Sequence, residues 1–218
     1  MSSQRLTLLF LAANPRDTDR LALDREARAI QVELERSGHR DLFQFETRWA
    51  AEPLDLLREL RKLRPTLVHV SGHGDPSGLF FQTPDGRSQV VSTAAIGQTF
   101  GAAGASVRVV VLSACYSDVH ADALLTHVDC VVGTTGAILD EAARSFAIGF
   151  YGAVGERESI AAAHRQGLAA IRLEHGPPWG ARDVVAPDPD LGTSPGYPRL
   201  RVRRGVDANT LVLGTAAP

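Results

Sequence analysis

The chain has 218 residues, the length of one large domain or of one domain with an appendage. Hydrophobic residues make up 44% of it and charged residues 22%, which excludes a disordered tail or a fibre. Lys and Arg number 23 against 25 Asp and Glu, and this net charge of -2 gives no electrostatic basis for binding nucleic acid or an anionic membrane.

Strand-like and helix-like patterns alternate along the first third of the chain. Residues 6–12 form an unbroken apolar run that stops at an Asn-Pro turn, which is typical of a strand buried on both faces. Residues 17–37 carry apolar side chains at helical spacing, and so do residues 53–63, which start with a proline. Between them, residues 42–49 alternate apolar and polar side chains, which predicts a strand nearer the edge of the sheet.

Two further apolar runs, residues 67–71 and 107–113, predict buried strands that end at reactive residue types. The first breaks at Gly72-His73-Gly74 and the second at Ala114-Cys115. Between them, two short strand patterns flank the pair Asp85-Gly86, which predicts a small β-hairpin insertion followed by a helix from residue 93.

The last part of the chain continues the alternation and then changes in composition. Residues 130–133 predict a strand, and residues 140–154 and 158–174 predict helices. Residues 176–198 are rich in proline and glycine and predict a loop, and residues 200–204 and 210–214 predict a late edge hairpin. The whole pattern predicts an α/β fold with a mostly parallel central sheet and helices on both faces.

His73 and Cys115 therefore follow strands of one parallel sheet, where the reactive crevice of such sheets lies. A thiol is a poor nucleophile until it is ionised, and an imidazole can take its proton and later protonate a leaving amine. The pair is a candidate dyad for acyl transfer. Gly72 and Gly74 allow sharp turns, and the backbone N–H groups of Gly74 and Cys115 are candidates for an oxyanion hole.

On the residues alone, other readings stay open. A cysteine at a strand end is usually a small buried hydrophobe, and Cys130 is assigned to that class. His69 fits a hydrogen-bonded core or cleft histidine better than a base. A glycine-rich turn can also cradle phosphate, but the known nucleotide-binding glycine patterns do not occur. The other histidines fit surface or helix positions and have no zinc spacing with a cysteine; they are His39, His120, His127, His164 and His175.

Three stretches of the chain carry a family resemblance: residues 68–81 (VHVSGHGDPSGLFF), residues 109–124 (VVVLSACYSDVHADAL) and residues 128–167 (VDCVVGTTGAIL and its continuation). Over residues 6–172 the chain resembles the CHAT class of bacterial caspase-like peptidases, in the clan of caspases, metacaspases and separase. The resemblance implies the three-layer caspase-like fold. It also implies that His73, followed by Gly74, and Cys115 form the catalytic dyad.

The resemblance also implies an S1 pocket, the slot for the residue before the cut. Related sequences tend to carry an acidic residue near Asp140, and Asp118 follows the cysteine by three positions. A carboxylate in this slot favours Arg or Lys. For both residues the open alternative is a role as a helix cap. The chain has SAC where caspases have QAC, so aspartate specificity has no support, and no calcium-binding loop, metal site or cofactor is indicated.

The expected function is thus a cysteine endopeptidase that cuts protein substrates after a basic residue and acts as an inducible effector in bacterial defence or regulated cell death. An upstream protease or a sensor protein is the expected activator, and cleavage near Arg182 or Arg199 is one hypothesis for activation. The rival readings are a catalytically idle interaction module and a small-molecule acyltransferase or amidase.

The domain and its location follow from the same features. We expect the peptidase domain over residues 1–175, with residues 176–218 as a Pro/Gly-rich loop and C-terminal strand appendage of the same domain. Two cysteines are too few for a disulfide framework, and the first apolar run is too short for a signal sequence or a membrane span. These features predict a cytoplasmic protein without nucleic-acid or membrane partners.

Overall fold

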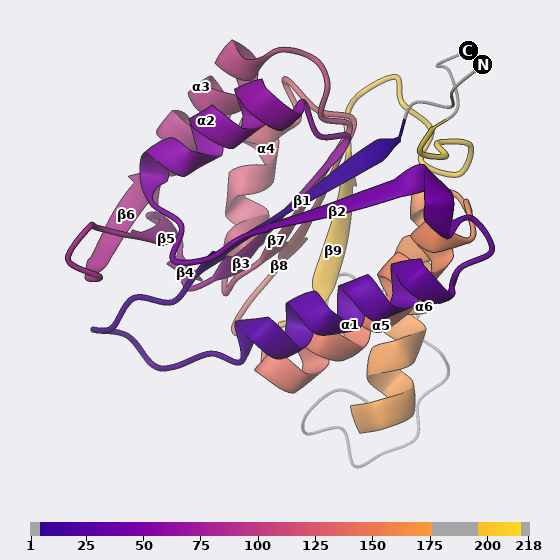
Figure 1. Cartoon of the computed structure of the whole chain (residues 1–218), viewed down its shortest axis with the longest axis horizontal. Coiled ribbons are helices and arrows are strands. Elements are labelled where there is room, and N and C mark those ends of the chain that lie inside the picture. Colours follow the sequence, from indigo (N-terminus) through magenta and orange to yellow (C-terminus); the bar gives the residue numbers. More distant parts are fainter. Residues whose placement is uncertain (1–4, 176–195, 215–218) are drawn as a thin grey trace.

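A six-stranded sheet crosses the middle of the molecule (Figure 1). The structure is a computed structural model, and it describes residues 5–175 and 196–214. The strands of the sheet are β1 (Leu6–Ala13), β2 (Phe43–Arg48), β3 (Leu67–Gly72), β7 (Val109–Ser113), β8 (Cys130–Thr134) and β9 (Pro198–Val202). Their order is β2-β1-β3-β7-β8-β9, and every neighbouring pair is parallel except β8 and β9. The predicted mostly parallel sheet is confirmed, and β2 is an edge strand as expected.

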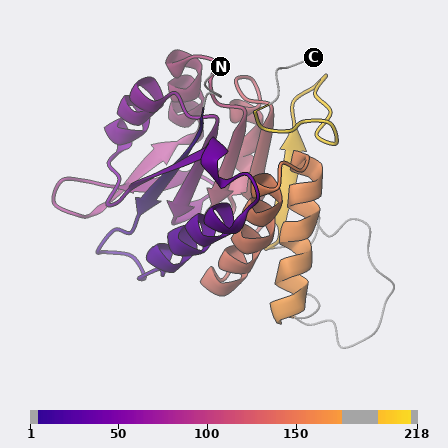
Figure 2. The same cartoon turned by 45° about the vertical axis from the view of Figure 1, so that its right-hand side comes forward.

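Helices cover both faces of this sheet (Figures 1 and 2). One layer contains α1 (Leu23–Arg36), α5 (Asp140–Gly155) and α6 (Ile160–His175), and the other contains α2 (Pro53–Leu63), α3 (Thr93–Ala103) and α4 (Ala121–Leu124). Strand β1 packs into both layers because its side chains alternate: Leu8 and Phe10 belong to the first core cluster, and Leu9 and Leu11 belong to the second. No helix within the described ranges has the length and apolar character needed to cross a membrane.

A small antiparallel sheet follows β3, as the Asp85-Gly86 pair predicts. It consists of β4 (Gly74–Asp75), β5 (Gly78–Gln82) and β6 (Ser88–Ser92), in that order. Gly86 adopts a left-handed φ of 79° in the turn between β5 and β6, a conformation that glycine reaches without a steric penalty. This hairpin leads directly into α3.

The predicted late hairpin is only half correct. Strand β9 forms, but residues 210–214 contain no strand. The carbonyl groups of Leu211 and Ala208 instead accept hydrogen bonds from Ile160 (2.9 Å) and Ala161 (3.0 Å) at the start of α6. Leu211 and Leu213 are buried in the first core cluster. The segment therefore satisfies the free N–H groups of a helix start instead of pairing as a strand.

The sequence analysis placed the candidate cleavage site Arg199 in an exposed loop, and this placement is also wrong. Arg199 lies within β9, where it pairs with Gly133 of β8. A backbone held in a strand ladder does not fit the extended cleft of a protease without local unfolding. Arg182 and most of the expected loop lie outside the described residues.

Candidate functional site

A cavity of about 240 Å³ lies at the carboxyl ends of the parallel strands. Its lining comes from four segments, residues 19–26, 71–73, 113–115 and 138–143, which follow or end β1, β3, β7 and β8. From β1 the chain runs first to β2 on one side and then to β3 on the other, so the strand order reverses between β1 and β3. Ligand sites of open α/β sheets form at such a reversal.

His73 and Cys115 both line this cavity, and both are partly exposed. Strands β3 and β7 are parallel neighbours, with Ser71 opposite Ser113 in the register. His73 and Cys115 each lie two residues beyond that pair. The shared register therefore brings the two reactive side chains to the same end of the sheet and into one cavity.

The imidazole of His73 has one nitrogen engaged by the backbone. Its Nε2 lies 2.7 Å from the carbonyl oxygen of Asp19, and because a carbonyl only accepts, Nε2 carries the proton and donates. A neutral imidazole has one N–H, so Nδ1 is then the basic nitrogen. This orientation leaves Nδ1 free of its proton, as a general base requires.

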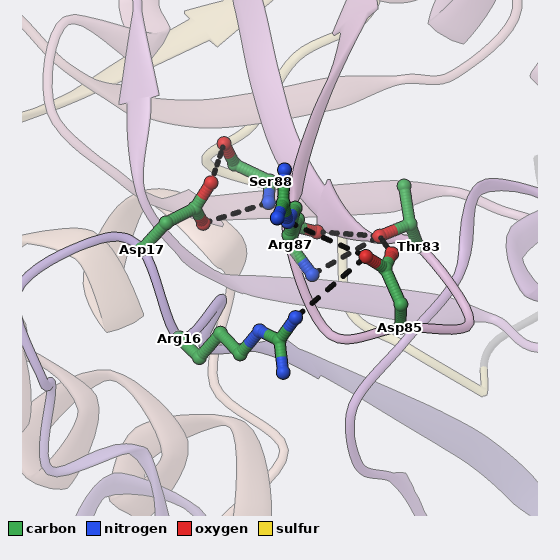
Figure 3. Close-up of polar contacts among 6 residues, drawn as sticks. All are labelled: Arg16, Asp17, Thr83, Asp85, Arg87 and Ser88. Atoms are coloured by element: carbon green, nitrogen blue, oxygen red, sulfur yellow. Dashed lines mark hydrogen bonds and ion pairs between the residues drawn. The ribbon is translucent and has the colours of Figure 1, made fainter.

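The loop that presents the Asp19 carbonyl is fastened to the β5–β6 turn (Figure 3). The carboxylate of Asp17 accepts hydrogen bonds from the N–H (2.8 Å) and the hydroxyl (3.1 Å) of Ser88, and Arg16 N–H donates to the Gly86 carbonyl at 2.9 Å. Partial desolvation of Asp17 opposes these bonds, but the hydrogen bonds from Ser88 prevail and lower the pKa of the carboxyl. We call these contacts the Asp17 clip.

Gly74 packs tightly against the cysteine segment. A Cβ at this position would lie 3.1 Å from the Cys115 carbonyl oxygen and 3.2 Å from the Ala114 Cβ. The absence of a side chain thus lets β4 approach the Cys115 segment closely. After Cys115 the chain turns through Tyr116, which has a left-handed φ of 56° and donates its N–H to the Gly136 carbonyl at 3.0 Å.

The cavity lining includes a buried acidic residue that the sequence analysis did not single out. Glu26 of α1 is only 5% exposed and lines the cavity. Its carboxylate accepts hydrogen bonds from the hydroxyl groups of Ser71 and Ser113. Burial by itself would raise the pKa of Glu26, but the charge of His69 and these hydrogen bonds outweigh it and hold the pKa below its ordinary value.

A sequence signal for Glu26 does exist. The residue lies three positions after Leu23 and four before Ile30, on the buried stripe of α1. A carboxylate on an apolar stripe needs buried partners, so its position alone indicates a special site.

The structure separates the two predicted acidic pocket residues. Asp140 lines the cavity at its exposed side, and its Oδ2 accepts a hydrogen bond from the N–H of Ala22 at 2.8 Å. It does not cap its own helix, because Leu139 occupies the N-cap position of α5. Asp118 is not part of the cavity lining, and its Oδ2 lies 3.5 Å from Arg199 and 3.4 Å from Arg201 of β9. Asp118 therefore holds β9 and does not reach the cavity.

Two histidines expected at surface or helix positions are buried. His120 contacts the Thr93 hydroxyl at 2.6 Å through Nδ1 and the Asp75 carbonyl at 3.1 Å through Nε2, which ties β4 to α3. His164 of α6 contacts the Pro198 carbonyl at 3.0 Å. Burial lowers the pKa of both side chains. The described residues contain no group of three or more side chains arranged to hold a metal ion.

Comparisons with known proteins agree with this architecture. A family model described as "CHAT domain" matches residues 2–179. A "Roc-COR-CHAT protease" from an unknown prokaryotic organism is 26% identical over 195 residues, which are 83% of this chain and 18% of that protein. A "Probable protease" from Gillisia limnaea is 24% identical over 173 residues, 77% of this chain and 31% of that protein. The chain thus spans less than a third of the length of either relative.

A similar fold occurs in a solved structure, the secreted C11 cysteine protease from Bacteroides thetaiotaomicron in complex with an irreversible peptide inhibitor. The TM-score is 0.58 at 12% sequence identity, and the match covers 78% of this chain and 59% of that chain. At this identity the likeness shows a shared fold.

Proposed function

The chain belongs to the CHAT domain family, and from this premise we propose that it is a cysteine endopeptidase with Cys115 as nucleophile and His73 as general base. The observation that carries the proposal is that both side chains line one cavity at the ends of the paired strands β3 and β7. The engaged Nε2 of His73 adds support, because it leaves Nδ1 as the basic nitrogen. The names of the two protease relatives point the same way.

The proposed reaction proceeds in two steps. His73 Nδ1 takes the thiol proton of Cys115, the sulfur attacks the peptide carbonyl carbon, and the carbonyl oxygen becomes an oxyanion. The N–H groups of Gly74 and Cys115 stabilise this charge, and the imidazolium then gives its proton to the leaving amine as the C–N bond breaks. Water, deprotonated by His73, hydrolyses the resulting thioester and restores the thiol.

The cavity favours a basic side chain before the cut. Glu26 contributes a buried, ionised carboxylate to the lining, and Asp140 adds a second carboxylate at the exposed side. An arginine or lysine side chain can pair with them, while an acidic side chain is repelled. We assign this role to Asp140 and to Glu26, and not to Asp118, which lies outside the cavity lining.

A role as an inducible effector in bacterial defence or regulated cell death completes the proposal. The name of one relative joins Roc and COR to a CHAT protease within a much longer protein. By analogy, this chain supplies the peptidase, and a sensor or an upstream protease supplies the trigger.

The test uses a fluorogenic peptide library that varies the residue before the cut. We expect cleavage after Arg and Lys, with a loss of more than about 10³-fold in kcat/KM in Cys115→Ala and in His73→Ala. Cys130→Ala serves as the matched control, because Cys130 is buried in β8, and it should retain cleavage. A preference for Asp or apolar residues before the cut would overturn the proposed specificity for Arg and Lys but not the peptidase assignment.

The peptidase assignment itself has a separate readout. An electrophilic peptide probe should attach to Cys115 in the native protein and should fail to do so in His73→Ala. A protein that neither cleaves nor takes up the probe at Cys115 would instead be the catalytically idle module.

A further inference from the structure

Behind the cavity, three buried side chains form one chain of polar contacts. His69 lies in the middle of β3 and is 2% exposed, between Glu26 of α1 and Tyr151 of α5. Its Nδ1 lies 2.8 Å from the Tyr151 hydroxyl, and its Nε2 lies 3.3 Å from Glu26 Oε1. The carboxylate that lines the cavity therefore lies beside a buried imidazole, and the two form an ion pair when His69 is protonated.

The surroundings of His69 isolate this pair. The titratable groups that the described residues place against it are Glu26 and Tyr151. The ring of Phe10 from β1 stacks on the imidazole, with centroids 4.9 Å apart, and the residue opposite on β7 is Val111. In such an apolar setting a change of one charge is weakly screened.

Tyr151 can serve His69 in either protonation state. Burial and the charge of Glu26 raise the pKa of Tyr151 well above its ordinary value, so the phenol keeps its proton. Its hydroxyl can donate to Nδ1 of a neutral imidazole or accept from the N–H of an imidazolium. His69 thus gains or loses a proton without losing its hydrogen-bond partner, and the consequence is a change of charge beside Glu26.

We propose that His69 is a specificity-determining residue whose protonation state sets the net charge of the cavity floor and thereby its selectivity for a basic side chain. This inference rests on the proposed function. With His69 protonated, the Glu26–His69 pair is neutral overall, and with His69 neutral the pair carries one negative charge. Selectivity for a cation over a neutral side chain is therefore higher when His69 is neutral than when it is protonated.

The coupling between substrate binding and proton binding at His69 has a second consequence. A cationic side chain that binds at Glu26 repels the proton on His69, so its binding releases protons where His69 is charged. A neutral side chain of the same shape does not. The arginine side chain carries this charge throughout, because it stays protonated at every pH in question.

The experiment compares peptides with Arg or its neutral isostere citrulline before the cut, between about pH 5.5 and 8.5. The ratio of the two kcat/KM values cancels the effect of pH on the chemical step, because both peptides use the same proposed dyad. We expect this ratio to rise about tenfold across the range, the order of magnitude for a nearby charge at intermediate dielectric. His69→Gln should give a high, pH-independent ratio, and Glu26→Gln a low, pH-independent one.

His164→Gln is the matched control, because His164 is a buried histidine on α6 whose ring contacts Phe146 and the Pro198 carbonyl. It should keep the wild-type pH dependence. If His69→Gln does not fold, the proposal can be tested by isothermal titration calorimetry of peptide binding to Cys115→Ala, which binds the peptides without cleaving them. Titrations in buffers of different ionisation enthalpy should show proton release with the Arg peptide and not with the citrulline peptide.

The outcomes separate the two proposals. An Arg preference with a pH-independent ratio, or equal proton release for both peptides, overturns the role of His69 and leaves the basic specificity intact. Equal cleavage of Arg and citrulline peptides at every pH, unchanged in Glu26→Gln, overturns the basic specificity on which the inference rests.

Discussion

At the scale of single residues, the two thiols of the chain lie in opposite surroundings. Cys115 lines the cavity and is partly exposed, whereas Cys130 is fully buried at the start of β8. Burial, reinforced by the charge of Asp129, raises the pKa of Cys130 to about 12. Cys130 is therefore both shielded and protonated, and its predicted place among the buried hydrophobes is confirmed.

This contrast predicts the alkylation pattern. At about pH 8 a thiol with a pKa of about 12 is ionised in only about one molecule in ten thousand. Iodoacetamide should therefore modify Cys115 alone in the native protein, and Cys130 only after denaturation, as peptide mass spectrometry would show. The Cys115→Ala variant should stay unmodified when native. Comparable labelling rates at the two positions would contradict the buried environment of Cys130.

At the scale of elements, the loop after β1 is held by a hairpin that comes much later in the chain. The Asp17 clip joins this loop to Ser88 of β6, and the same loop presents the Asp19 carbonyl to His73. The orientation of the His73 imidazole, the proposed general base, thus depends on contacts between the loop after β1 and β6. Asp17 is in this sense a positioning residue.

Removing the clip should lower turnover without unfolding the protein. In Asp17→Ala we expect kcat to fall about tenfold, because small displacements of a catalytic group are costly, with little change in Tm at this exposed site. Asp17→Asn should restore most of kcat, because its amide oxygen can still accept from the Ser88 N–H. Steady-state kinetics and thermal melts measure both quantities.

Asp85→Ala is the matched control in the same turn. Asp85 pairs with the side chains of Arg16 and Arg87, which are largely exposed, and both of these ion pairs join side chains alone (Figure 3). Its kcat should stay near the wild-type value. A wild-type kcat in Asp17→Ala would show that the Asp19 carbonyl needs no support from the clip.

Strand β9 also forms ion pairs with segments from other parts of the chain. Arg199 and Arg201 pair with Asp118, which lies just beyond Cys115, and Arg203 and Arg108 pair with Asp129. The last described strand is therefore held to the segment that follows Cys115. It belongs to the same sheet as β3 and β7, the strands that precede His73 and Cys115.

At the scale of the whole molecule, the C-terminal residues complete the main core. Tyr197, Leu211 and Leu213 are buried in the cluster between the sheet and the layer of α1, α5 and α6. Each such side chain contributes roughly 1.5–3 kcal/mol on burial, so three of them approach the 5–15 kcal/mol stability of a typical domain. The boundary at residue 175 between a domain and an appendage thus reflects a change in sequence composition. We propose that the two parts fold together.

A chain that ends at residue 175 should therefore lose cooperative thermal unfolding, as calorimetry would show. Leu211→Ala in the full-length chain is the milder test and should destabilise the protein by about 2–5 kcal/mol. Val202→Ala, at an exposed position of β9, is the control and should cost far less. A truncated chain that melts like the full-length protein would show that the peptidase core is independent of its C-terminal residues.

The elements and the pair at their ends were predictable from the sequence. Helix α2 has the predicted bounds, and the Asp85-Gly86 turn, the edge position of β2 and the buried strands β3 and β7 follow from periodicity and turn residues. These signals are local, because a strand or a turn is specified by neighbouring residues. His73 and Cys115 could be found because they directly follow such strands.

The partners of those residues were decided by tertiary structure alone. Ser113 donates to Glu26 across 87 positions of the chain, His73 donates to the Asp19 carbonyl across 54, and Asp118 meets Arg201 across 83. Residues 210–214 read as a strand, yet they accept hydrogen bonds at the start of α6. A sequence pattern reports which face of an element is buried, but the groups that meet there are chosen only when packing brings distant segments together.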